Sequence, residues 1–192
     1  MRFSIITVCF NSEKTIERTL ISVLNQDYTD YEYIIIDGNS NDHTIEIINK
    51  YKKRFCNRLQ IISETDDGIY DAMNKGIRMA KGDWIGIINS DDWYESNALR
   101  LVDGATKNMD KNQPAVAYGL CRIIDESGKL NMVILRTENE LLKGVSMLHP
   151  SAFINRAAYS QVGVYSTDYP YCADYDLFLR MKSKGTVFMA IE

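Results

Sequence analysis

Two adjacent aspartates, Asp91 and Asp92, follow an apolar run at residues 84–89 that is typical of a buried strand. Neighbouring carboxylates repel each other, so such a pair must be protonated, hydrogen-bonded or neutralised by a cation. Carboxylate oxygens suit Mg²⁺ and Mn²⁺, which proteins usually hold with one or two carboxylates plus substrate phosphates. The pair therefore indicates a cation-assisted phosphate site.

Two further apolar runs also end in aspartate. Asp37 follows the run at 32–36, and Asp66 comes shortly after the run at 59–63. In an open parallel α/β sheet, ligands bind outside the carboxyl edge of the strands. We therefore expect carboxylates from three strands to face one crevice.

Some of these aspartates also admit a purely structural interpretation. Asp42 precedes a predicted helix and is typical of a helix cap. Asp92 and Glu95 have the spacing of a capping box, and Asp37-Gly38 is typical of a turn. Three coincident strand ends nevertheless favour a shared binding site.

The hydrophobic pattern predicts the elements that position these residues. Four apolar runs are typical of strands, at 3–10, 32–36, 59–63 and 84–89. Each precedes a segment with helical spacing of apolar residues, at 13–26, 43–54, 69–81 and about 95–108. Four strand–helix units predict a three-layer α/β/α fold with a mostly parallel central sheet. The strands are apolar throughout, as expected when both faces of the sheet are buried.

The pattern changes after Pro114, where a smaller antiparallel β region is expected. Strands are predicted at 115–124, 130–135, 151–155 and 186–191, with a hairpin turn at 126–129 and a helix at 174–183. We expect one domain over 1–192, with a soft boundary near residue 112.

The composition is that of an ordinary globular protein, 45% hydrophobic and 25% charged. A net charge of −4 argues against a bulk electrostatic grip on nucleic acid. Four scattered cysteines and two histidines disfavour a zinc site of the usual spacing and fit a reducing cytosol. No segment approaches the roughly 18 consecutive apolar residues of a membrane span.

Three common ligand-binding loops are missing from the sequence. No G-x-G-x-x-G follows the first predicted strand, which disfavours a dinucleotide-dependent dehydrogenase. The P-loop pattern and the G-x-S-x-G elbow are also missing, which disfavours an NTPase and an α/β-hydrolase. The predicted site therefore combines oxygen ligands with no glycine-rich phosphate loop.

Five motifs, in order along nearly the whole chain, resemble the family-2 inverting glycosyltransferases, which have the GT-A fold and use nucleotide-sugar donors. The motifs are IITVCFN at 5–11, DGNSNDHT at 37–44, SETDDGIYDAMNKG at 63–76, NSDD at 89–92 and ADYDLFLR at 173–180. Each motif is weak alone, but five in the same order are specific.

The resemblance implies roles for individual residues. The implied donor-binding residues are Thr7, Phe10, Asn11, Asp37, Asp66 and Asp91. Asp92 would bind a Mn²⁺ or Mg²⁺ ion as the last residue of the family's D-x-D-type motif, and His149 is a further candidate ligand. Asp174 would be the catalytic base. Asp176 stays an alternative base, because Ala173 stands where the family often has an acidic residue.

The resemblance also implies a reaction. A sugar would pass from a nucleotide-diphosphate sugar, most commonly a UDP-sugar, to the hydroxyl of a saccharide or lipid-linked acceptor, with inversion. Such enzymes serve cell-surface polysaccharide or glycolipid synthesis, which implies a cytoplasmic protein or one peripheral to the inner face of the membrane. The alternative is a non-catalytic nucleotide-sugar-binding or docking module, although a module of that kind needs neither Asp92 nor Asp174.

The resemblance divides the single predicted GT-A domain into two halves. Residues 1–112 would bind the donor, and residues 113–192 would form the acceptor side. Family members usually run on beyond the helix that carries the base. We therefore expect the acceptor side to be truncated or minimal.

Overall fold

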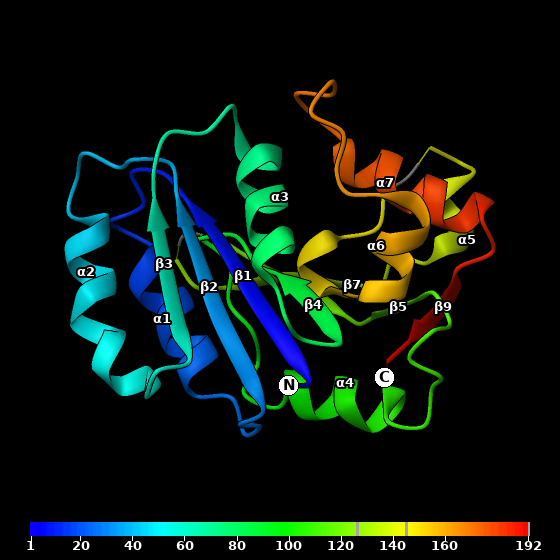
Figure 1. Cartoon of the computed structure of the whole chain (residues 1–192), viewed down its shortest axis with the longest axis horizontal. Coiled ribbons are helices and arrows are strands. Elements are labelled where there is room, and N and C mark those ends of the chain that lie inside the picture. Colours follow the sequence, from blue (N-terminus) through cyan, green and yellow to red (C-terminus); the bar gives the residue numbers. More distant parts are fainter. Residues whose placement is uncertain (126, 145, 192) are drawn as a thin grey trace.

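The computed structural model describes residues 1–125, 127–144 and 146–191 and contains a seven-stranded central sheet in the order β3-β2-β1-β4-β8-β5-β9 (Figure 1). All neighbouring strands are parallel except β8, which is antiparallel to both β4 and β5. The strands are β1 (Phe3–Cys9), β2 (Tyr31–Asp37), β3 (Leu59–Ser63), β4 (Trp84–Ile87), β5 (Ala115–Tyr118), β8 (Ala152–Asn155) and β9 (Val187–Ala190).

Helices cover both faces of this sheet, so the expected three-layer α/β/α fold is confirmed. One face packs against α1 (Ile16–Leu24), α2 (Thr44–Tyr51), the 3₁₀ turn η1 (Lys52–Phe55) and α4 (Ala98–Thr106). The other face packs against α3 (Ile69–Met79), α5 (Glu138–Leu141), α6 (Arg156–Val162) and α7 (Ala173–Ser183). A second 3₁₀ turn, η2 (His149–Ser151), leads into β8.

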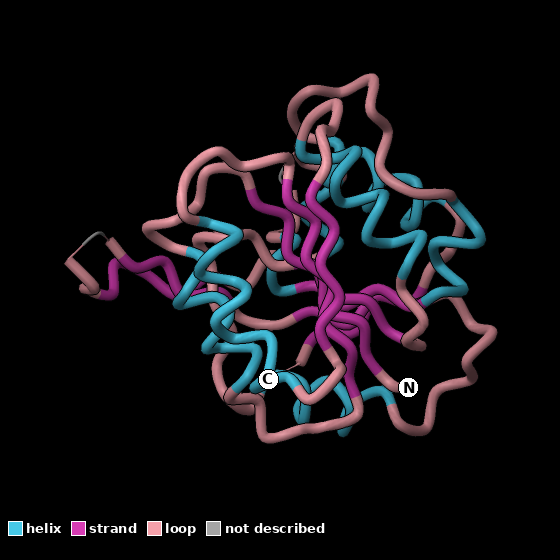
Figure 2. Tube along the Cα trace, turned by 60° about the vertical axis from the view of Figure 1, so that its left-hand side comes forward, coloured by secondary structure: helices cyan, strands magenta, loops and turns pink. Residues whose placement is uncertain are grey.

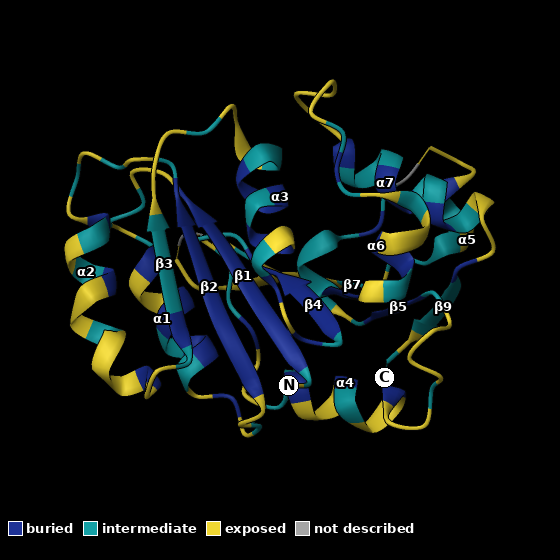
Figure 3. Cartoon of the chain, in the orientation of Figure 1, coloured by how far each residue is buried: buried dark blue, intermediate teal, exposed yellow. Residues whose placement is uncertain are grey.

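The alternation of side chains along each strand explains the continuous apolar runs. In β1, Ile6 and Val8 enter the core under α3, whereas Ile5 and Cys9 enter the core over α1. All seven residues of β1 and of β2 are buried, as the dark strands of Figure 3 show. The exposed polar residues therefore begin where the strands leave the core, at the edge of the sheet.

The register brings the carboxyl ends of the first strands level with one another. Cys9 of β1 pairs with Asp37 of β2, which pairs in turn with Ser63 of β3. The loops that follow these three strands consequently start from the same edge of the sheet. The loop after β4 leaves from that edge too, since β1 and β4 are parallel neighbours.

The single strand predicted at 115–124 is wrong, because the structure divides it into two. β5 stays in the central sheet, whereas β6 (Cys121–Ile124) pairs antiparallel with β7 (Leu130–Ile134) in a separate two-stranded sheet. Figure 2 shows this hairpin projecting from the body of the molecule. Within the predicted turn at 126–129, Glu126 lies outside the described residues, and the Gly128 amide donates to the Asp125 carbonyl at 2.9 Å.

The predicted helix at 95–108 begins later, at Ala98, with Asn97 as the preceding residue. The capping-box interpretation of Asp92 and Glu95 is therefore wrong. Short helices α5 and α6 were not predicted, although both carry recognisable caps. In the part of the chain that the structure describes, no helix is both long enough and apolar enough to cross a bilayer.

Candidate functional site

A cleft of about 950 Å³ opens at the carboxyl edge of the central sheet. The loops after β1, β2, β3 and β4 all contribute to its walls. Four of the predicted donor-binding residues line it: Phe10, Asn11, Asp66 and Asp91. Of the three strand-end carboxylates expected to face one crevice, Asp66 and Asp91 do so, whereas Asp37 does not line the cleft.

The β1 and β2 loops hold each other at one end of the cleft. Asn11 has a left-handed backbone, with φ of 49°, and its amide nitrogen donates to Ser40 Oγ at 2.8 Å. Its side-chain oxygen accepts from the Asn41 amide at 3.0 Å. Phe10, 61% exposed, is left free to present its ring to the cleft.

Gly38 gives Asp66 its place in the cleft. A Cβ atom at Gly38 would lie 2.7 Å from Asp66 Oδ2 and 3.4 Å from the Phe10 ring. The other oxygen of Asp66 accepts from the Gly68 amide at 3.0 Å. Asp66 therefore approaches the β2 loop closely because glycine leaves the space.

Helix α1 fixes the loop that carries the two adjacent aspartates. The Thr19 hydroxyl donates to the carbonyl oxygens of Ser90 and Asp92, at 3.0 and 2.7 Å. The Arg18 guanidinium stacks on Trp93, 3.6 Å from the ring centroid. Thr19 and Arg18 were not among the predicted site residues, because their role depends on a contact between elements far apart in the sequence.

The aspartate pair is electrostatically strained, as the sequence predicted. Burial, followed by the charge of Asp91, raises the pKa of Asp92 to about 6, against the opposing effects of a hydrogen bond from Asn89 and the charge of Arg18. Asn89 Oδ1 is buried and has no hydrogen-bond partner among the described residues. A cation beside these oxygens would relieve the repulsion and satisfy the unpaired acceptor.

These residues fit a divalent ion that is completed by phosphate oxygens. The donors are hard carboxylate and amide oxygens, which suit Mg²⁺ or Mn²⁺. Among residues 1–125, 127–144 and 146–191, no three His, Cys, Asp or Glu side chains are placed to hold a metal by themselves. An ion at Asp92 would therefore draw further ligands from outside these side chains, such as the oxygens of a bound diphosphate.

Asp37 and Thr7 do not line the cleft, and both are fully buried. Asp37 accepts hydrogen bonds from the Ser40 amide at 3.0 Å, from the Ser63 hydroxyl at 2.7 Å and from the Ser40 hydroxyl. Thr7 accepts from the Tyr33 hydroxyl at 2.9 Å. Their observed contacts hold the β1, β2 and β3 ends together beneath the cleft.

Asp174 lies in the first turn of α7. It lies beside Ser146, in the loop before η2, and beside His149 of η2. Ser146 Oγ donates to Asp174 Oδ2 at 3.2 Å, and His149 Nδ1 lies 3.9 Å from the same oxygen. Burial lowers the pKa of His149, opposed by the charge of Asp174. His149 Nε2 is buried and lacks a partner within the described residues. Ser146, which no sequence motif indicated, is thus a direct neighbour of the predicted base.

Helix α3 borders both the cleft and the start of α7. Ile69 and Ala72 of α3 line the cleft, while Tyr70 on the same helix faces the start of α7. Burial, followed by the charge of Asp174, raises the pKa of Tyr70. Asp174 and the cleft therefore both border α3.

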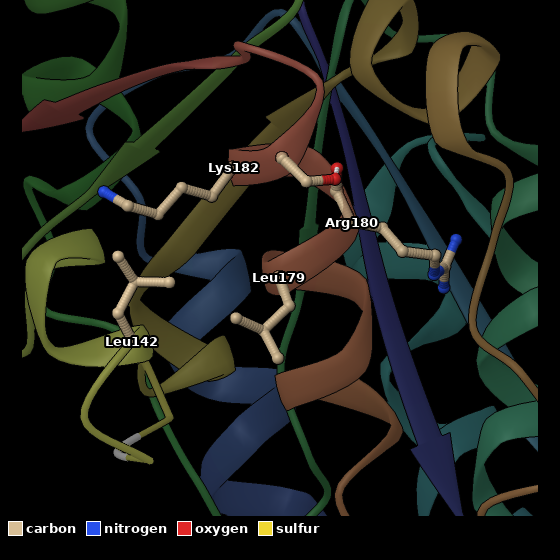
Figure 4. A pocket seen from close by; sticks show the side chains of 5 residues that line it. Leu142, Leu179, Arg180 and Lys182 are labelled. Atoms are coloured by element: carbon tan, nitrogen blue, oxygen red, sulfur yellow. Dashed lines mark hydrogen bonds between the residues drawn. The ribbon is translucent and has the colours of Figure 1, made fainter.

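Arg180 ties α7 to the end of α6 and to the loop that follows α6. Its Nε donates to Asp176 Oδ2 at 2.8 Å, and its other nitrogens donate to the carbonyl oxygens of Val162 and Val164. A hollow of about 520 Å³ lies at the carboxyl half of α7 (Figure 4). There Leu142 of the α5 region and Leu179 point toward each other, whereas Arg180 points away from them.

Several known proteins are similar to this chain. A family model described as glycosyl transferase family 2 matches residues 4–165. A PGL/p-HBAD biosynthesis glycosyltransferase of Mycobacterium tuberculosis is 31% identical over 180 residues, which cover 93% of this chain and 68% of the relative. The chondroitin synthase of Escherichia coli is 30% identical over 188 residues, 95% of this chain but 26% of the relative.

Solved structures share the fold. Staphylococcus aureus TarS in complex with UDP-GlcNAc has a TM-score of 0.76 at 18% identity, covering 100% of this chain and 59% of that one. The mannosyltransferase PcManGT from Pyrobaculum calidifontis, in complex with GDP-Man and Mn²⁺, has a TM-score of 0.75 at 17% identity, covering 98% and 54%. The chain thus spans less than two thirds of these structures.

The three-layer α/β/α fold, with acidic loops at the carboxyl edge of its central sheet, places the chain in the GT-A class. The chain belongs to glycosyl transferase family 2.

Proposed function

We propose that this chain transfers a sugar from a nucleotide-diphosphate sugar, with a UDP-sugar as the expected donor, to a hydroxyl acceptor with inversion. The observation that carries the proposal is the cleft at the carboxyl edge of the sheet, which Asp66 and Asp91 both line, with the half-buried Asp92 next to Asp91. The names of the relatives support a role in glycolipid or polysaccharide synthesis. We propose a saccharide or lipid-linked acceptor, reached from the cytoplasmic face of the membrane.

In this proposal the nucleotide lies between Phe10 and Asp66, and its diphosphate lies beside Asp91. Asp92, with Asp91 and Asn89 nearby, would hold Mn²⁺ or Mg²⁺. When bound, such an ion supplies positive charge that stabilises the departing diphosphate. His149 faces Asp174, 3.9 Å away, so we assign it to the acceptor side and not to the metal.

Asp174 acts as the general base. The acceptor oxygen forms a bond to the anomeric carbon, and its proton passes to the Asp174 carboxylate. The bond between the anomeric carbon and the diphosphate oxygen breaks, and the diphosphate leaves with the electron pair. Attack and departure on opposite faces invert the carbon in one displacement, so no protein nucleophile is required. Ser146 orients Asp174 through its hydrogen bond of 3.2 Å.

A melting-temperature screen of UDP-, GDP- and dTDP-sugars, with Mn²⁺ or with a chelator, tests the donor site. One donor should raise the melting temperature, and chelation should remove the effect. Release of the nucleoside diphosphate in the presence of candidate acceptors then tests transfer. Stabilisation without any release would favour the non-catalytic alternative, and no stabilisation by any donor would contradict the proposal.

A further inference from the structure

The loop between α6 and α7, residues 163–172, has no role in the proposed chemistry but leads directly into the proposed base. Tyr169 is 50% exposed and Tyr171 is 82% exposed. Figure 3 shows this loop as an exposed segment that rises above the start of α7. Two large aromatic rings so close together in the sequence and so exposed suggest a surface that is covered by a ligand.

Both ends of the loop are fixed. The Tyr165 amide donates to Asn74 Oδ1 at 3.0 Å, and Asn74 Nδ2 donates to the Tyr165 carbonyl at 2.9 Å. The Tyr165 ring stacks on Tyr70 with the centroids 5.5 Å apart. At the other end, the carbonyl of Cys172 accepts from the Asp176 amide at 3.2 Å in the first turn of α7. Contacts with α3 and α7 therefore fix both ends of the loop that carries Tyr169 and Tyr171.

Pro170 stands between the two exposed tyrosines. Its ring fixes its own φ, and it restricts Tyr169 before it to extended backbone. The segment Tyr169-Pro170-Tyr171 thus has few conformations to lose when a ligand binds. Preorganisation of this kind lowers the entropic cost of binding.

The exposed side chains of the loop favour one chemical class of ligand. Residues 163–172 include no lysine or arginine, and Asp168 carries the one formal charge of the segment. The loop itself therefore offers no cation to a phosphate, a uronate or an anionic bilayer, and Arg180, which touches the loop at Val164, is already paired with Asp176. Apart from Asp168, the exposed side chains from Thr167 to Tyr171 are hydroxylated, aromatic or proline, which disfavours an alkyl chain. An uncharged sugar offers both C–H faces for the rings and hydroxyls for the polar groups.

The position of the loop fits an acceptor. The hydroxyl that reacts must come within hydrogen-bond reach of Asp174, the second residue of α7. The rest of the acceptor must then extend past the first turn of α7, where Tyr171 precedes the helix. The Tyr165 ring at the base of this loop stacks on Tyr70, and burial and then the charge of Asp174 raise the pKa of Tyr165.

We propose that Tyr169 and Tyr171 form a platform that binds the uncharged sugar rings of a saccharide acceptor next to the reacting hydroxyl. The inference rests on the proposed function, because Asp174 marks the reacting end of the acceptor.

A glycan array with uncharged, uronate-bearing and phosphate-bearing oligosaccharides tests the platform on the full chain. We expect the chain to retain uncharged glycans, and the Tyr169→Ala/Tyr171→Ala variant to bind them about tenfold more weakly, since each ring contact is worth about 0.5–1.5 kcal/mol. The Tyr169→Phe/Tyr171→Phe variant keeps the rings and should stay within about threefold. Met132→Ala, at a residue 52% exposed on the β6–β7 hairpin, is the matched control and should change nothing.

Equal binding by the alanine variant and the unchanged chain would overturn the platform. Retention of charged glycans alone, of anionic phosphatidylglycerol vesicles alone, or of no glycan at all would overturn it too. The donor-induced rise in melting temperature is measured on the same variants and should be equal in all. If no donor stabilises any of them while glycan binding still follows the tyrosines, the proposed function fails and the sugar-binding surface stands.

Discussion

Asp174 and Asp176 lie two residues apart on α7 and have different partners. Asp174 Oδ2 accepts a hydrogen bond from the Ser146 hydroxyl at 3.2 Å, whereas Asp176 Oδ2 pairs with Arg180 Nε at 2.8 Å. A carboxylate paired with a guanidinium is a poor proton acceptor, because the cation stabilises its ionised form. The contacts therefore favour Asp174 over Asp176 as the base.

Replacing Asp174 with Asn should lower kcat about 1,000-fold, within the range expected for loss of a general base. The donor Kd should change less than about twofold, because Asp174 does not line the cleft. Steady-state transfer kinetics and donor titration measure the two quantities. Asp176→Asn is the matched control. It should keep transfer within about tenfold and lose on the order of 1 kcal/mol of stability with its Arg180 pair. The reverse pattern would assign the base to Asp176.

Removing the charge of Asp92 should change how stability depends on pH. The pKa of Asp92 rises from 3.8 to about 6 on folding, so the folded protein binds more protons between these values, and stability falls as pH rises through them. Asp92→Asn should therefore be more stable than the unchanged chain at pH 7, by on the order of 1 kcal/mol after allowance for solvent screening. The difference should vanish below pH 4.

Urea denaturation with a chelator present, at several pH values, measures this difference. Adding Mn²⁺ with a nucleoside diphosphate should then stabilise the unchanged chain and leave Asp92→Asn almost unaffected. A variant that is less stable than the unchanged chain at pH 7 would contradict the assignment of repulsion to the Asp91–Asp92 pair.

Adding a methyl group at Gly38 should damage the donor site. In Gly38→Ala the new Cβ would lie 2.7 Å from Asp66 Oδ2, so Asp66 must move. Donor affinity should fall about tenfold in calorimetric titration. Gly104→Ala is the control, since a Cβ there meets nothing within 4 Å. It should leave donor affinity unchanged and raise stability by about 0.5–1 kcal/mol, as alanine does in a helix. Equal donor affinities for the two variants would argue against Asp66 as a donor contact.

Asp37 should behave as a structural residue. Asp37→Asn places an NH₂ group among the hydroxyl and amide donors of Ser40 and Ser63, so stability should fall by about 2–3 kcal/mol in denaturant titration. Ser63→Ala keeps the carboxylate and removes one hydroxyl donor, and it should cost about 1 kcal/mol. A fully stable Asp37→Asn that has lost donor binding would instead support the direct donor contact implied by the sequence.

The first half of the fold was predictable because its strands are short, apolar and bounded by polar residues. The predicted strand 59–63 coincides with β3, and 32–36 lies within β2. The convergence of Asp66 and Asp91 followed from strand direction alone. The burial of Asp37 did not, because its nitrogen and oxygen donors, the amide and hydroxyl of Ser40 and the hydroxyl of Ser63, all belong to residues outside its own strand.

The second half was harder, because its elements are short and pair over long distances. Gly119 and Leu120 separate β5 from β6, and neither position interrupts the apolar pattern. The cap of α6 was visible in principle: Asn155 accepts from the Ala158 amide at 2.9 Å. Thr137 and Glu140 likewise form the capping box of α5, a spacing that the sequence displays.

The antiparallel strand β8 has a consequence for synthesis on the ribosome. β8 lies between β4 and β5, so β4 gains its outer neighbour only after residues 152–155 have been made. Until then a nascent chain carries an unpaired edge beside the loop of Asp91 and Asp92, open to pairing with other chains. If the chain transfers sugar as proposed, it should become competent only after residues 152–155 have emerged, and release before that point would yield an aggregation-prone fragment.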